Sequence, residues 1–223
     1  MRDLSGLAAL YCFFYATEKI PLVNATTLAS TAPLFIPFIV LFHHKLVIPK
    51  KRMLGLLIGF IGVVTIVKPT GASAAVPAEW IGLLSGLLAA VAYVYIRKLS
   101  KVESTFSILF TFFLVSTIVS FPPMLITWEP IESSTIGLYL LLICIFGTIY
   151  QYFLTKAYTH APPSKASAMS YLSVVFSGLL GWITLGEIPT LWGFIGIALI
   201  ICGGLIVVFD KEQPRIWGSK KLD

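Results

Sequence analysis

The stretch "YATEKIPLVNATTLAS", Tyr15 to Ser30, ends one apolar run, turns at Pro21 and begins another. A similar stretch, "KAYTHAPPSKASAMSY", occupies Lys156 to Tyr171. Both have an alanine, a proline and a second alanine at the same relative positions. This spacing suggests the hypothesis that one helical hairpin is written twice in the chain.

The composition is that of an integral membrane protein. The 223 residues are 57% hydrophobic and only 12% charged, whereas soluble chains carry about 25% charged residues. The excess apolar surface requires a lipid bilayer as its partner. Cys12, Cys144 and Cys202 lie far apart inside apolar runs, without the spacing of metal ligands. Neither a metal nor a cofactor is expected.

Eight apolar runs are long enough, or nearly so, to cross a hydrocarbon core, which takes roughly 20 residues. Continuous runs without strict alternation favour helices over barrel strands. We therefore predict an all-α polytopic membrane protein with eight transmembrane helices. The first run has a basic start and a short apolar centre, so a signal peptide is an alternative interpretation of that run. The runs are Leu4–Thr17, Val23–Phe42, Met53–Val67, Ala78–Ile96, Ser104–Ile126, Ile136–Tyr158, Ser164–Leu185 and Thr190–Phe209.

The basic residues predict the orientation of these spans. With eight crossings, 14 of the 16 lysines and arginines fall on the side that holds the N-terminus. Only Lys19 and Lys68 fall on the opposite side. By the positive-inside tendency, both termini are expected in the cytoplasm. The net charge of +6 is thus a topology signal, and no nucleic-acid partner is expected.

A shift of 141 residues lays the first three spans on the last three. The displacement is five spans, so the second copy crosses in the opposite direction, which is the inverted repeat of many secondary transporters. The second copy has five spans and the first only three, so two helices ahead of Met1 are expected from a longer chain or a partner. The identities at this shift are Gly6/Gly147, Tyr11/Tyr152, Ala16/Ala157, Pro21/Pro162, Ala25/Ala166, Phe35/Phe176, Gly55/Gly196 and Gly62/Gly203.

Several segments resemble the EamA-type group of the drug/metabolite transporter superfamily. They are "TAPLFIPFIVLF", "LGLLIGFIGVVTIVKP", "AAVAYVYIRKLSK" and "LGEIPTLWGFIGIALIICGGLIVV". The resemblance implies a carrier with ten helices, of which this chain matches the third to the tenth. It also implies a partial first repeat over residues 1–68, a complete second repeat over 78–209, and a cytoplasmic basic tail over 210–223. The chain departs from the family pattern at His43-His44-Lys45, where Gly-Glu is common, as at Gly186-Glu187.

Polar residues inside the spans are the candidate substrate contacts, because polar groups in lipid are expensive. Thr26 with Ser30, and Ser167 with Tyr171, are four apart and share a helix face. The repeat pairs these two sets and places them on either side of the midplane. Close helix packing is the alternative role for such residues. The candidates are Tyr11, Thr26, Ser30, Tyr93, Gln151, Tyr152, Ser167 and Tyr171.

The predicted function is a carrier or exchanger that moves a small polar metabolite by alternating access. No Asp or Glu lies in the middle of a predicted span, which disfavours a proton-driven exporter. No catalytic constellation is found, so an enzyme is not expected. A shortened subunit or regulator that does not transport alone is the main alternative. The expected location is a bacterial inner membrane, and a homodimer stays open.

Overall fold

The structure is a computed structural model of the chain. It describes residues 1–20, 22–67, 77–126, 128, 133–172, 175–176, 183, 191–211 and 215–216. Most of the predicted span Ser164–Leu185 beyond residue 172 lies outside the described residues, as does most of the tail over 210–223.

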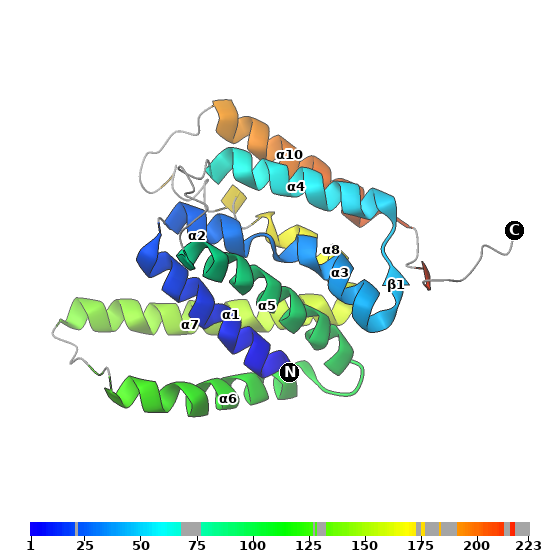
Figure 1. Ribbon diagram of the computed structural model, residues 1–223. Coiled ribbons are helices and arrows are strands. Elements are labelled where there is room, and N and C mark those ends of the chain that lie inside the picture. The colour runs from blue at the N-terminus through cyan, green and yellow to red at the C-terminus, as the bar shows by residue number, and fades with distance from the viewer. Residues whose placement is uncertain are drawn as a thin grey trace, which may run out of the picture.

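The described elements are helices, apart from one pair of two-residue strands (Figure 1), so the prediction of an all-α chain is confirmed. The strands β1 (Leu46–Val47) and β2 (Arg215–Ile216) pair antiparallel. The helices are α1 (Arg2–Lys19), α2 (Leu22–Ala29), α3 (Ala32–His44), α4 (Lys50–Val67), α5 (Pro77–Leu99), α6 (Thr105–Ile126), α7 (Ser134–His160), α8 (Pro163–Ser170) and α10 (Leu191–Phe209).

Five segments of the described chain are long and apolar enough to span a membrane: Ala25–Phe42 and the helices α5, α6, α7 and α10. The helices α1 and α4 have 18 residues each, including charged residues at their ends. Their apolar parts are short for a crossing, so eight crossings stay a prediction.

Local sequence accounts for the ends of α5. Pro77 occupies the first position of the helix, where its missing N–H costs nothing. Glu79 lies in the first turn, and Arg97 and Lys98 lie in the last turn. These charges complement the helix dipole.

The predicted span Val23–Phe42 overlaps the candidate span Ala25–Phe42, but its regular helix is interrupted by a turn at Ser30 and Thr31, between α2 and α3. Pro33 stands at the start of α3, and its ring prevents the preceding turn from continuing as regular helix. The Thr31 hydroxyl donates to the Leu28 carbonyl over 2.6 Å, and the Ser30 hydroxyl donates to Thr26 over 2.7 Å. The helix α8 also ends in a turn, at Tyr171, which lies 141 residues after Ser30.

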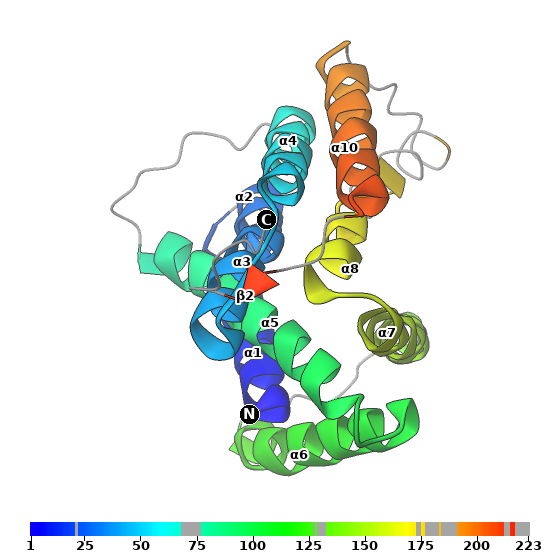
Figure 2. The same cartoon turned by 90° about the vertical axis from the view of Figure 1, so that its right-hand side faces the viewer.

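Two closely packed helix pairs form the body of the molecule. The helices α1 and α5 lie against each other in its middle. The helices α4 and α10 lie side by side at one end, with α6 at the other, as Figure 2 shows. The α4–α10 pair is backbone to backbone: a Cβ at Gly55 would lie 2.8 Å from the Gly203 carbonyl oxygen, and one at Gly62 would lie 2.7 Å from the Gly196 carbonyl oxygen. Glycine is required at this crossing.

Candidate functional site

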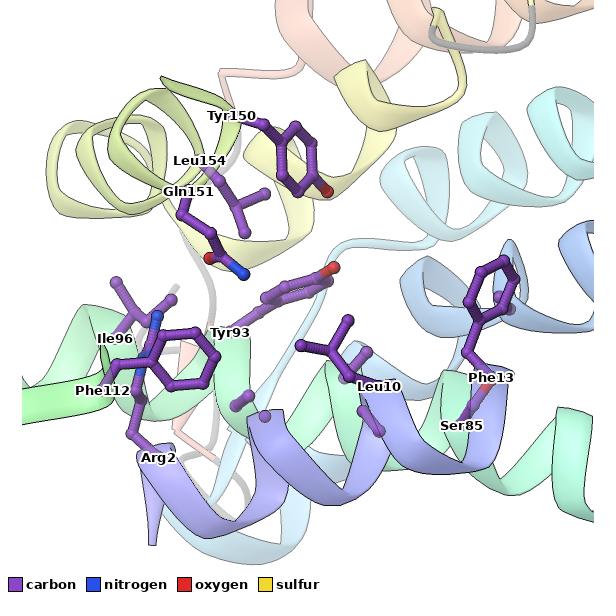
Figure 3. Close-up of a pocket in the computed structure, with 15 residues that line it drawn as sticks. Arg2, Leu10, Phe13, Ser85, Tyr93, Ile96, Phe112, Tyr150, Gln151 and Leu154 are labelled. Carbon is purple, nitrogen blue, oxygen red and sulfur yellow. The ribbon is translucent and has the colours of Figure 1, made fainter. Parts of the chain in front are cut away.

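A cavity of about 300 Å³ lies between α1, α5, α6 and α7. Small residues on α1 and α5 create the space, among them Gly6, Ala9, Ala89 and Ala92. Leu10 and Phe13 form an apolar wall on α1 (Figure 3). The cavity is therefore mostly apolar, with a few polar side chains directed into it, which is the usual character of a small-molecule site.

Tyr93 and Tyr150 bring two hydroxyl groups to this cavity from facing helices. Tyr93 lies on α5 and Tyr150 on α7, and both line the cavity. Figure 3 shows the two hydroxyl groups directed to the same side of the cavity. Tyr93 also stacks on Tyr158, with ring centroids 4.6 Å apart and an interplanar angle of 17°. The position of the Tyr93 ring is thus fixed by contacts with α7.

Three polar side chains follow one face of α7. Gln151, Thr155 and Tyr158 stand at positions i, i+4 and i+7, which share a helix face. Thr155 and Tyr158 are 0% and 1% exposed. The Gln151 Oε1, the Thr155 hydroxyl and the Tyr158 hydroxyl are buried and make no hydrogen bond with any residue that the structure describes. Native proteins leave few such groups, and of these three only Gln151 lines the cavity, so Gln151 is the one placed to contact a polar solute.

Two of the eight predicted contacts, Tyr93 and Gln151, line this cavity. Ser30 is engaged at the break between α2 and α3 with the backbone of Thr26, although the adjacent Ala29 reaches the cavity wall. Ser167 is 0% exposed and donates to the Ser164 carbonyl over 3.4 Å.

The other predicted tyrosines lie elsewhere. Tyr171 is 2% exposed, and its ring packs against Gly59. Tyr11 is half-exposed and donates to the Ser120 hydroxyl over 2.9 Å, joining α1 to α6. Tyr152 is also exposed and lines a surface groove between α6 and α7. The two half-sites expected on either side of the midplane are not brought together with Tyr93 and Gln151.

The structure adds cavity residues that the sequence interpretation missed. Tyr150 stands next to Gln151 in an apolar run. Arg2 reaches the same cavity from the first turn of α1 and is 3% exposed. The helical period of Gln151, Thr155 and Tyr158 in an otherwise apolar segment could have drawn attention to this part of α7, but it does not include Tyr150 or Arg2.

Comparison with known proteins shows clear relatives. The EamA-like transporter family matches residues 76–209. The pseudopaline exporter CntI of Pseudomonas aeruginosa is 36% identical over 213 residues, which are 93% of this chain and 71% of that protein. An S-adenosylmethionine uptake transporter of Rickettsia prowazekii is 25% identical over 213 residues, 96% of this chain and 72% of the relative.

An uncharacterized transporter of Helicobacter pylori is 30% identical over 225 residues, 96% of this chain and 75% of the relative. One solved crystal structure has a TM-score of 0.77 at 22% identity, over 92% of this chain and 74% of the other. At that identity the likeness establishes the fold.

Proposed function

Because the chain belongs to the EamA-like transporter family, we propose that it is a secondary transporter whose cargo binds in the cavity between α1, α5, α6 and α7. Family membership makes it a multi-pass membrane transporter and not an enzyme. Relatives are named for the transport of small metabolites, and we assign a small polar metabolite to this chain. A bacterial inner membrane is its proposed location.

The observation that carries this proposal is the Gln151 amide in the cavity. Its Oε1 is buried without a hydrogen bond to the described residues, and Tyr93 and Tyr150 stand beside it. An amide both donates and accepts hydrogen bonds, so it can bind a polar group of either kind. The apolar remainder of the wall excludes water from the bound cargo.

The proposed mechanism is alternating access by an inverted repeat, in which residues 1–68 match part of residues 78–209. The glycine crossing supports it. The 141-residue shift pairs Gly55 with Gly196 and Gly62 with Gly203. The contact of Gly55 with Gly203 therefore becomes the contact of Gly62 with Gly196 when the copies are exchanged. Equivalent contacts of this kind are expected from a two-fold axis between the copies.

The pairing of β1 with β2 supports the proposed orientation, in which both termini are cytoplasmic. Leu46 and Val47 follow α3, and they pair with Ile216 and Arg215 in the segment after α10. Paired strands lie on the same side of a membrane, so this loop and this tail share one side. That side carries most of the lysines and arginines.

We expect liposomes that contain the purified chain to exchange metabolites of a carbon-13-labelled bacterial extract, as followed by mass spectrometry. Gln151→Leu is expected to lower the exchange rate about tenfold, because it removes a desolvated hydrogen-bonding group from the site. Phe153→Leu is the matched control, since Phe153 is exposed on another face of α7. Inert liposomes with folded protein would contradict the proposal and favour the role of a subunit. Equal rates for the two variants would remove Gln151 from the site.

A further inference from the structure

Arg2 is the charged residue among those that line the cavity. Its side chain is 3% exposed, and the guanidinium lies 3.9 Å from the centroid of the Phe112 ring. Gly6 makes room for this ring, since a Cβ there would lie 3.2 Å from Phe112 Cε2. The cation is therefore held in a fixed position by apolar neighbours on α1 and α6.

The guanidinium has donors left over in this position. Arg2 Nη1 lies 3.5 Å from Asp3 Oδ1, which gives an ion pair at the long end of the range. Arg2 Nε and Nη1 are buried and make no hydrogen bond with the described residues. A buried cation with unused N–H donors is costly unless an anion completes it. Carboxylates and phosphates match the planar fork of a guanidinium.

We propose that the cavity selects solutes that carry an oxyanion, a carboxylate above all, and that Arg2 holds this group. The inference rests on the proposed function, because it names the chemical class of the cargo. The Gln151 amide can turn an N–H toward the same group. The body of the solute lies along the apolar wall that Leu10 and Phe13 provide. An anionic lipid headgroup carries the same chemistry, so lipid is the second source to be tested.

The test compares a carboxylate with its neutral counterpart of nearly equal shape. The probes are 4-phenylbutyrate and 4-phenylbutyramide, titrated against the chain in nanodiscs of zwitterionic lipid, with the thermal midpoint as the readout. We expect the carboxylate to bind about 10- to 100-fold more tightly, as charge-assisted hydrogen bonds imply. Arg2→Gln abolishes this preference, and Arg2→Lys keeps part of it. The control Lys101→Gln removes an exposed charge and leaves the preference intact.

The absence of any difference between carboxylate and amide in the unmodified chain would overturn the proposal, whether or not Arg2→Gln folds. A preference that persists in a folded Arg2→Gln variant would overturn the role of Arg2.

A second set of outcomes distinguishes lipid from a soluble cargo. If added phosphatidylglycerol stabilises the chain, this effect is lost in Arg2→Gln, and the soluble probes show no preference, the oxyanion site belongs to lipid. Exchange limited to neutral or cationic metabolites would overturn this inference and leave the proposed function standing. If the chain binds the carboxylate but exchanges no metabolite, the proposed function would be overturned and this inference would stand.

Discussion

Gly203→Leu is expected to prevent the chain from folding stably, whereas Gly147→Leu leaves its thermal midpoint nearly unchanged. A Cβ at Gly203 would lie 2.6 Å from both the Gly55 carbonyl oxygen and the Gly59 amide nitrogen. Because both atoms belong to the backbone of α4, no change of rotamer relieves the clash. The helices α4 and α10 must then move apart.

Overpacking typically lowers the free energy of unfolding by about 1–3 kcal/mol. Because this clash is with backbone atoms, we expect a loss near the upper end of that range. Around Gly147, by contrast, a Cβ would meet no atom of the described residues within 4 Å. Differential scanning fluorimetry in nanodiscs and the yield of monodisperse protein measure the effect. Similar midpoints for the two variants would show that α4 and α10 do not approach as closely as described.

Arg52→Met is expected to destabilise the chain strongly, because it leaves the carboxylate of Asp210 buried without this cation. Arg52 Nη2 lies 3.0 Å from Asp210 Oδ2, and both side chains are 2% exposed. Arg52 Nη1 also donates to the Ser164 hydroxyl over 3.3 Å. The loss of one partner of a buried pair costs about 3–5 kcal/mol.

The pair of Lys19 and Glu18 provides the control. These side chains lie 2.7 Å apart and are 49% and 68% exposed, so Lys19→Met is expected to change the midpoint little. The double variant Arg52→Met, Asp210→Leu recovers much of the loss, since neither charge of this pair is then left buried without the other. An Arg52→Met variant as stable as Lys19→Met would mean that water reaches Asp210.

The Arg52 pair also joins the two proposed copies at one end of the molecule. Arg52 lies in the first turn of α4 and Ser164 in the first turn of α8, whereas Asp210 follows α10. Lys165 adds a second tie, donating to the carbonyl oxygens of Val208 and Asp210 over 3.0 and 2.8 Å. Under the proposed mechanism, a conformational change that opens this end either breaks these contacts or moves the contacting segments together.

Long continuous apolar runs predicted the helices α5, α6, α7 and α10, because burial in lipid leaves the backbone few other options. The break at Ser30 and Thr31 was missed because Pro33 was interpreted as part of one run. Proline is tolerated in membrane helices often enough that its position alone does not decide between a kink and a break. The strands β1 and β2 have two residues each, which is too short to show an alternating sequence pattern, so the sequence could not predict their pairing.

The candidate site was only partly predictable. Tyr93 and Gln151 were found because polar groups inside an apolar run require a reason. Tyr11 and Tyr152 are candidates because the repeat aligns them with each other. A repeat shows that two positions are equivalent, but it does not show which residues each side chain contacts. In the sequence, Arg2 counts as one of the basic residues that predict membrane orientation, since a cation at the start of a helix is commonly such a signal. Only the packing of Phe112 against the guanidinium distinguishes a buried cation from one at the membrane surface.

The helix α7, which lines the proposed binding cavity, is longer than a crossing of the hydrocarbon core requires. It has 27 residues, about 40 Å of helix at 1.5 Å a residue, against a hydrocarbon core of about 30 Å. Its buried residues, Thr155 and Tyr158, lie in its second half, and most residues of the first half are exposed in the part of the chain that the structure describes. A helix longer than the core responds to bilayer thickness by tilting. Because Gln151 lies in the second half of α7, we expect the length of the lipid acyl chains to influence the shape of the proposed binding cavity.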